Sequence, residues 1–424
     1  MISVCRKWAK TSIVFVDINK LYIIDMKIIF AFIIIIFLAF SGYHLTFKGY
    51  RLPFFARKFY LTGTEFLFFG LLLGPQFLNL MDYETCQGLE TLSALLLGWV
   101  GLLFGFQFEL AKIVRFPVEF FLAAVFESLL TFVFVFLGIF LILWQFIYIS
   151  DPMKIIASLI LAAAAACTSQ TGLALLAPAK VVGRKETFML LRYISSMDGL
   201  SALLIFCLIF FFNPPGFSHF SWLGNFLNFT FLSLGAVAGI ILIYTILLSQ
   251  RLNENVLTAI VISMVVLSSG IALVINFSPL LANFFLGFCL VNTSKKKERI
   301  FKMLIKIEKP VYLLILVFLG ATWNIGSGWF FLFAAGYSIF RFSGKFMGGF
   351  IITRISHGFK THPRTLGLGL IDSGGLPLAI LFDFQMRFPG ETTSQIIGLA
   401  LLAVIYNDFL SALSIRWLLK KAPA

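Results

Sequence analysis

Long apolar segments recur from near the start of the chain to its end. A helix needs about 20 consecutive apolar residues to cross the hydrocarbon core of a bilayer. Of the 424 residues, 60% are hydrophobic and 12% are charged, whereas soluble domains carry about 25% charged residues. A soluble protein with this composition would lack a solvated surface. The sequence therefore predicts an all-α polytopic membrane protein.

We interpret thirteen of these segments as transmembrane helices, with boundaries uncertain by several residues. The predicted spans are 27–46, 60–74, 88–108, 117–143, 153–178, 187–212, 223–249, 255–275, 277–292, 310–324, 328–354, 364–385 and 395–419. The residues before them are weakly apolar and lack the apolar core and cleavage site of a signal peptide. We therefore interpret residues 1–26 as an N-terminal extension, with Met26 as an alternative start of translation.

The loops between the predicted spans alternate in charge. One set holds 23 Lys and Arg residues, and the opposite set holds only Lys154 and Arg387. Because basic loops stay on the cytoplasmic side of a membrane, this pattern predicts an external N-terminus and a cytoplasmic C-terminus in the plasma (inner) membrane. The net charge of +14 is concentrated in these loops, so it does not indicate a nucleic-acid partner.

The sequence offers little support for metal, cofactor or enzyme chemistry. The five cysteines form no CxxC pair, and none of the four histidines lies in the middle of a span. The hydroxyl residues near Asp198 have no deep histidine with which to form a catalytic triad. We therefore expect a protein that is not an enzyme and that has no resident metal or cofactor.

Several ionisable residues lie within predicted spans, where a charge is costly and usually functional. They are Glu127, Arg192, Asp198, Arg341, Lys345, Asp372 and Asp408. Asp198 lies near the middle of its span, and a structural ion pair is the alternative to an ion-binding role. Lys345 is also deep, and an isolated lysine there would lose its proton or pair with a carboxylate. Arg192 is expected to reach the cytoplasmic surface, and helix packing is the alternative role of Arg341.

Two predicted spans carry interruptions. Residues 166–178, ACTSQTGLALLAP, contain a polar run before Gly172, and residues 367–380, GLGLIDSGGLPLAI, contain two adjacent glycines and Pro377. Proline and glycine weaken a helix, and non-helical backbone at membrane depth must be buried in protein or line a wet cavity. A pair of interrupted helices in corresponding positions is typical of the ion site of a transporter. The alternative is a pair of kinks used only for packing.

Several short motifs occur in an order and spacing that resemble a known superfamily. They are YRLPFF followed by FLFFGLLLGPQFL, then LLLGWVGLLFGFQFEL with Glu109 at its acidic position, FSPLLANFFLGFCLVN, and GLGLIDSGGLPLAI. From Met26 onward, the chain resembles the cation:proton antiporter superfamily of sodium/proton and potassium/proton exchangers, and specifically the Kef/Nap-like membrane domain.

The resemblance implies an inverted repeat with two broken, crossing helices, which is the sodium/proton antiporter fold. Residues 117–212 and 328–419 would form the two repeats of a mobile core that carries the ion. Residues 27–108 and 255–324 would form a scaffold that faces a second copy in a homodimer, and residues 223–249 would be a linker helix.

The resemblance also implies site residues. Asp198 matches the essential ion- and proton-binding aspartate, and Lys345 matches a lysine found in some members. The hydroxyls and carbonyls of the first broken helix would complete the site, through Thr168, Ser169, Gln170 and Thr171. The chain departs from the pattern at Met197, where members carry Asp, Asn or Gln, so the second aspartate that normally pairs with the lysine is missing. Asp372 and Asp408 are candidates to replace that partner, and pairing of Lys345 with Asp198, or with neither acid, stays open. Arg341 and Asp372 would compensate charge, and Glu127 and Asp408 are secondary candidates.

These residues predict secondary antiport, in which Asp198 binds either a proton or one monovalent cation, Na⁺ or K⁺. One cycling carboxylate makes one-for-one exchange the simplest stoichiometry. Two alternatives remain open: a potassium efflux pathway that conducts like a channel, and a symporter of organic anions. The expected partners are membrane lipid, the cation, the proton and a second copy of the chain.

Overall fold

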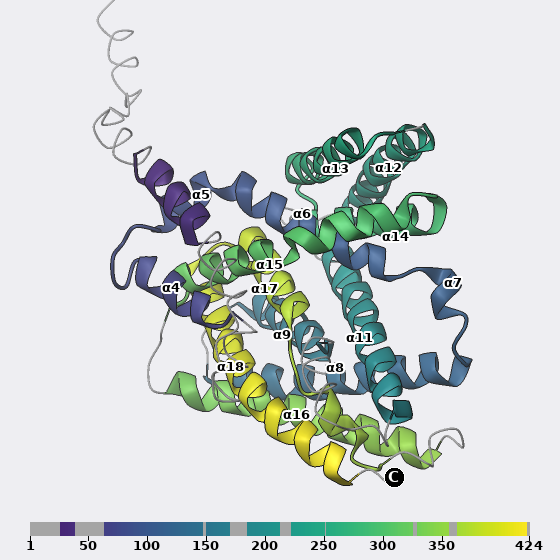
Figure 1. The fold of residues 1–424 in the computed structure, drawn as a ribbon. Helices are drawn as coiled ribbons and strands as arrows, with labels where there is room; N and C mark the ends of the chain where they lie inside the picture. The colour runs from purple at the N-terminus through teal and green to yellow at the C-terminus, as the bar shows by residue number, and fades with distance from the viewer. Residues whose placement is uncertain are drawn as a thin grey trace, which may run out of the picture.

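The computed structural model describes residues 26–38, 63–146, 150–169, 185–212, 222–250, 252–324, 329–355 and 363–421. These residues fold into helices, and none of them lies in a strand (Figure 1). Each of the thirteen predicted spans overlaps a helix of the described chain. The prediction of an all-α polytopic membrane protein is confirmed at this level.

The first described helix covers Met26–Leu38. The others are α4 (Glu65–Leu73), α5 (Tyr83–Gly88), α6 (Glu90–Gln107), α7 (Leu110–Ile113), α8 (Val118–Phe146), α9 (Asp151–Ala166), α11 (Lys185–Phe212), α12 (Trp222–Ser249), α13 (Glu254–Val274), α14 (Pro279–Thr293), α15 (Lys297–Ala321), α16 (Trp329–Ile355), the 3₁₀ turn η4 (Leu366–Leu370), α17 (Gly375–Arg387) and α18 (Glu391–Lys421). Within this described part, all or most of α6, α8, α11, α12, α13 and α18 is long and apolar enough to cross a membrane.

The boundary of one predicted span is wrong. The charge pattern places residues 295–309 in a basic cytoplasmic loop, but α15 begins at Lys297 and continues through Pro310. Its first half is amphipathic, because Ile300 and Leu304 are fully buried while Lys302 and Lys306 are exposed. Burial of that apolar stripe stabilises a helix that the charge pattern alone had suggested was a loop.

The second predicted interruption is present in the described chain, where residues 371–374 separate η4 from α17. At the first, helix α9 ends at Ala166 and residues 167–169 are not helical, while residues 170–184 lie outside the described residues. The two segments meet where the Ser169 amide donates a hydrogen bond of 2.9 Å to the Asp372 carbonyl. Gly374 has a φ of +73°, and a Cβ there would lie 2.6 Å from the Cβ of Ser169. Only glycine suits this position in the crossing.

Helices α8 and α16 pack side by side at the lower edge of the view in Figure 1. Their backbones approach closely because α16 presents glycines to α8. A Cβ at Gly344 would lie 2.7 Å from the Cα of Thr131, and one at Gly348 would lie 2.7 Å from the Cγ of Glu127. This close approach sets Glu127 against the turn of α16 that carries Lys345.

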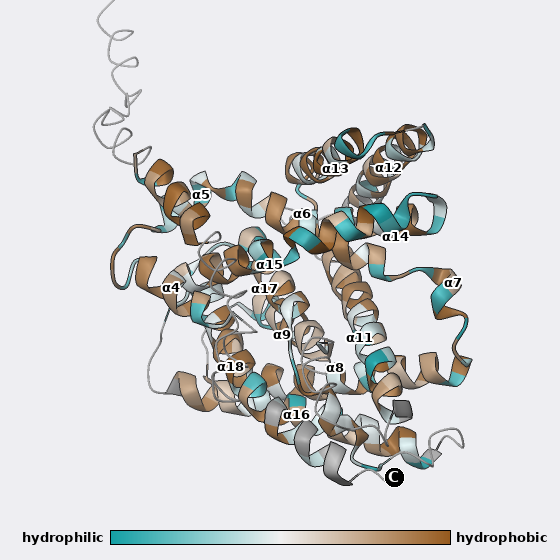
Figure 2. Cartoon of the chain, viewed as in Figure 1, coloured by the Kyte–Doolittle hydropathy of each residue, from teal (hydrophilic) through white to brown (hydrophobic). Residues whose placement is uncertain are grey.

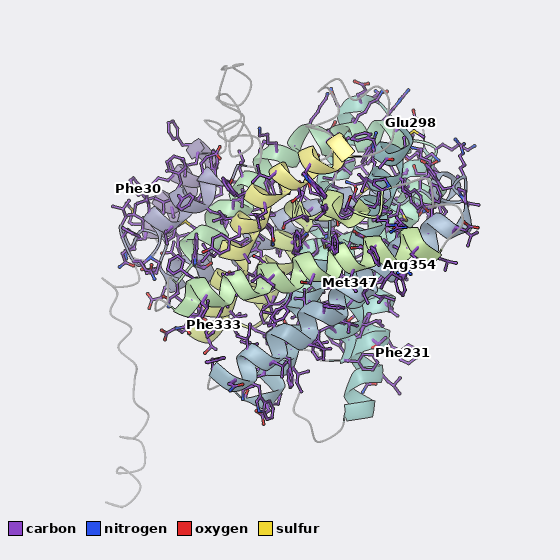
Figure 3. The ribbon with its side chains drawn as sticks, turned by 90° about the horizontal axis from the view of Figure 1, so that it is seen from below. Phe30, Phe231, Glu298, Phe333, Met347 and Arg354 are labelled. Carbon is purple, nitrogen blue, oxygen red and sulfur yellow. The ribbon has the colours of Figure 1, made fainter. Side chains whose placement is uncertain are left out.

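Hydrophilic segments gather at particular parts of the molecule. Figure 2 shows hydrophilic residues at α7 and at the turn after α14. Figure 3 places Glu298 and Arg354 toward one end of the molecule and Phe333 toward the other. Glu298 and Arg354 come from segments of the basic set, so two of these segments lie at a common end. The assignment of that end to the cytoplasm stays a prediction.

Candidate functional site

Asp198 lies in α11 beside the crossing of the two interrupted helices, and its side chain is fully buried. The Thr168 hydroxyl donates a hydrogen bond of 2.6 Å to its Oδ2 atom, and the same hydroxyl lies 3.3 Å from the Leu370 carbonyl oxygen. The other carboxylate oxygen, Oδ1, has no hydrogen-bond partner among the described residues. A buried carboxylate with an open oxygen is suited to accept a proton or a cation.

Lys345 joins Asp198 to a second carboxylate. Its Nζ atom donates to Asp198 Oδ2 at 2.8 Å, to Glu127 Oε2 at 3.0 Å and to the Ala166 carbonyl at 2.7 Å. The three charged side chains have no exposed surface. An ammonium group has three donors, so these contacts use all of them.

This pairing decides between the partners that the sequence left open for Lys345. The lysine binds Asp198, one of those alternatives, and Glu127, and neither Asp372 nor Asp408 takes the place of the missing second aspartate. The reason lies in helix packing, because the glycines of α16 bring α8 close enough for Glu127 to reach the ammonium. We had ranked Glu127 only as a secondary candidate. The sequence feature that could have indicated its role is that it is a lone glutamate in an apolar span, while another span is rich in glycine.

Arg341 lies one turn before Lys345 on α16 and is almost fully buried. Its Nε atom donates to the Ala165 carbonyl at 2.9 Å, and its Nη2 atom donates to the Cys167 carbonyl at 2.8 Å. It also donates to the carbonyls of Ile371 and Asp372. Helix interruptions leave carbonyls without intrahelical partners, so this guanidinium stabilises both interrupted segments at once.

The second interruption supplies two more acids. Asp372 Oδ1 accepts a hydrogen bond of 3.1 Å from Ser411, whose hydroxyl lies 3.0 Å from the Asp408 carbonyl oxygen. Asp372 and Asp408 are both largely buried. Since the donors of Lys345 are used elsewhere, these acids belong to a separate polar group next to the crossing. Gln170 and Thr171, which we also predicted at the site, lie outside the described residues.

A cavity of about 680 Å³ leads to this crossing. Its lining includes Glu298, which Figure 3 places at one end of the molecule, and also Thr168, Ser169, Asp372 and Asp408. Asp198 is not part of the lining, and Thr168 both borders the cavity and bonds the Asp198 carboxylate. An ion that enters from this end would therefore meet hydroxyls and carboxylates before it reached Asp198.

Ion pairs join helix ends whose residues line this cavity. Glu109, between α6 and α7, pairs with Lys297 at 2.7 Å and with Lys112 at 2.9 Å. Hydrogen bonds from Lys297 and then Lys112 hold the pKa of Glu109 below its ordinary value. These contacts connect α7 and the start of α15 to the end of α6.

At the far end of α17, Arg387 contacts the turn between α13 and α14. Its Nη1 atom donates to Asn276 Oδ1 at 2.9 Å, and its Nη2 atom donates to the Phe277 carbonyl. Our sequence reasoning assigned no role to Arg387, although it was one of only two basic residues in the weakly charged loop set. The contact ties an interrupted helix to a separate helix pair.

Comparisons with known proteins agree with this architecture. Residues 35–421 match the family described as sodium/hydrogen exchanger, transmembrane. The fold is similar to that of the sodium proton antiporter MjNhaP1 from Methanocaldococcus jannaschii, with a TM-score of 0.62 and 18% sequence identity. That match covers 95% of this chain and 99% of MjNhaP1. No curated protein sequence matches the chain.

At 18% identity, the likeness to MjNhaP1 shows the fold alone. The family match is independent of that likeness and extends over most of the chain. It also agrees with the resemblance that the sequence motifs carried. The chain belongs to the sodium/hydrogen exchanger family.

Proposed function

We propose that the protein exchanges one monovalent cation for one proton across a membrane, with Asp198 as the group that binds both in turn. The observation that carries the proposal is the state of this carboxylate. It is fully buried beside two interrupted helices, its Oδ2 atom is shared by Thr168 and Lys345, and its Oδ1 atom has no partner among the described residues. Family membership makes cation/proton exchange the expected activity.

A hard monovalent cation prefers oxygen ligands. The Asp198 carboxylate, the Thr168 and Ser169 hydroxyls and the unwound carbonyls near Leu370 offer such ligands around the crossing. A cation that binds at the open Oδ1 atom lies on the same carboxylate as the Lys345 ammonium at Oδ2, and the repulsion between the two positive charges drives the ammonium away from Asp198. A proton on Asp198 removes the negative charge of the carboxylate and so prevents the cation from binding there. Cation and proton therefore compete for Asp198.

Transport also requires that the site be exposed to each side in turn. In our proposal, residues 117–212 and 328–419 move as a core past a scaffold formed by residues 27–108 and 255–324. Movement with a bare Asp198 would bring an unbalanced charge against an apolar barrier, which prevents leak without exchange. Residence in the plasma membrane, a homodimer, an external N-terminus and a cytoplasmic C-terminus are part of the same proposal.

The organic-anion alternative receives less support. An anion needs donors that are free to bind it. In the described part of the site, Arg341 is committed to backbone carbonyls and Lys345 to two carboxylates and a carbonyl. The donors of Arg341 and Lys345 are thus already used by these acceptors, which leaves none for an organic anion. The conducting alternative differs in flux, because a channel would pass K⁺ without a coupled proton.

Reconstitution in proteoliposomes tests the proposal. A pH gradient is imposed, and cation uptake and proton release are followed together with Na⁺ and with K⁺. We expect coupled flux in the wild type and none in Asp198→Asn. The matched control is Asp151→Asn, which makes the same change at an exposed side chain. Exchange by Asp198→Asn at the wild-type rate, or K⁺ flux without proton movement, would refute it.

A further inference from the structure

The Lys345 ammonium is held between two buried carboxylates that come from different helices. Glu127 belongs to α8 and Asp198 to α11, and neither they nor Lys345 have exposed surface. The distances from Nζ, 3.0 Å and 2.8 Å, make the two partners nearly equivalent. One positive charge cannot neutralise two negative charges, so the three residues balance when one proton or one cation joins them.

The two carboxylates differ in their access to the cavity. Asp198 is bonded by Thr168, which lines the cavity, whereas Glu127 is bonded by Thr131, which does not. Thr131 donates to Glu127 Oε1 at 3.2 Å, and Gly348 leaves room for the glutamate chain against α16. Asp198 is thus linked to the cavity lining through Thr168, and Glu127 has no such link among the described contacts.

We propose that Glu127 holds the Lys345 ammonium whenever a cation occupies Asp198, so that the lysine stays charged throughout exchange. This inference rests on the proposed function and concerns the residue that gives up the proton. When a cation displaces Nζ from Asp198, the ammonium keeps Glu127 and the Ala166 carbonyl. The proton exchanged for the cation then comes from the carboxylate pair.

Without Glu127, a cation at Asp198 would leave the ammonium with a carbonyl as its remaining described acceptor. A buried lysine without a counter-charge is destabilised as a cation and releases its proton. Cation binding would then depend on deprotonation of the lysine. Before the cation binds, that lysine is paired with Asp198, and an adjacent opposite charge favours its charged form, so release of its proton requires a higher pH than release of a proton from the carboxylate pair. Glu127 therefore sets the pH range in which exchange operates.

The other charged and titratable groups around Lys345 do not replace Glu127. Arg341, on the same helix, donates to carbonyls of the interrupted segments and stays positive. The Cys167 thiol, after α9, lies next to the lysine and donates to the Ala163 carbonyl. From the second interruption and α18, Asp372 accepts from Ser411, and Asp408 lines the cavity. Lys345 has no donor left for either acid.

The test is cation-induced proton release from purified protein, measured with a pH-sensitive dye across a range of pH. We expect Glu127→Gln to move the midpoint of release to higher pH by at least about one unit, which is tenfold in proton concentration. Glu127→Asp keeps the charge but withdraws it from Nζ, so it should give a smaller shift in the same direction. The double variant Glu127→Gln with Lys345→Gln should lose the alkaline shift, because the lysine proton is no longer there to release.

Each outcome bears on a different claim. If Glu127→Gln and Glu127→Asp keep the wild-type midpoint, the inference is overturned while the proposed function stands. If Glu127→Gln does not yield folded protein, Glu127→Asp decides the matter with the same readout. Asp151→Asn serves as the acid-to-amide control at an exposed position and should keep the wild-type midpoint. Loss of exchange in Asp198→Asn is measured separately and reports on the proposed function alone.

Discussion

Replacement of Arg341 by lysine tests how the two interrupted helices are held. The guanidinium donates to four backbone carbonyls. Two lie at the end of α9, in Ala165 and Cys167, and two follow η4, in Ile371 and Asp372. Lysine keeps the charge but presents it as a single point with a different reach. We expect it to satisfy no more than two of the four carbonyls.

The magnitude follows from the bonds that are lost. A hydrogen bond to a charged group contributes about 1.5–3 kcal/mol, so the loss of two bonds destabilises the fold by about 3–6 kcal/mol. The entropy of unfolding is about 2.1 cal/mol/K per residue, so for this chain of 424 residues each kcal/mol lowers the melting temperature by about 1 °C. We therefore expect Arg341→Lys to melt at least about 3 °C below the wild type.

The assay is thermal unfolding of detergent-solubilised protein, followed by size-exclusion chromatography of the fraction that stays monodisperse. Arg354→Lys is the matched control, because Arg354 lies in the last turn of the same helix with an exposed side chain. A melting temperature of Arg341→Lys equal to that of Arg354→Lys would refute this account of the carbonyls.

Two further predictions concern other parts of the site. Gly374→Ala should reduce exchange at least about tenfold, because the backbone there is strained for other residues by about 1–3 kcal/mol and the new Cβ would meet Ser169. Gly390→Ala, where a Cβ would meet open space, is the control in the same flux assay. Equal exchange rates of the two variants would contradict the prediction. Glu109 has a lowered pKa because of Lys297 first, so its stabilising effect is complete above the ordinary glutamate value of about 4.3 and is lost as the pH falls below it. The melting temperature of the wild type should therefore fall more between pH 6 and pH 3 than that of Glu109→Gln, and parallel curves would contradict this.

The sequence predicted the parts of the molecule that depend on local pattern. Apolar length placed each predicted span on a helix, the glycine-rich run near Gly374 located the second interruption, and the polar run at Thr168 marked the end of α9. The start of α15 was missed because a high density of lysine masked the apolar stripe through Ile300 and Leu304.

The pairing of Lys345 with Glu127 could not be predicted, because it depends on the register of α16 against α8. Glu127 and Lys345 are 218 residues apart, and no local pattern fixes which turn of one helix faces which turn of the other. The role of Arg341 was hidden for a similar reason. Its partners are backbone carbonyls, which carry no signal in the sequence.

The central claim is that Asp198 is the group at which cation and proton compete. The most direct measurement is the number of protons released when Na⁺ or K⁺ is added to the purified, weakly buffered protein. The account predicts about one proton per bound cation for the wild type and none for Asp198→Asn. Release of the same number of protons by Asp198→Asn would contradict it.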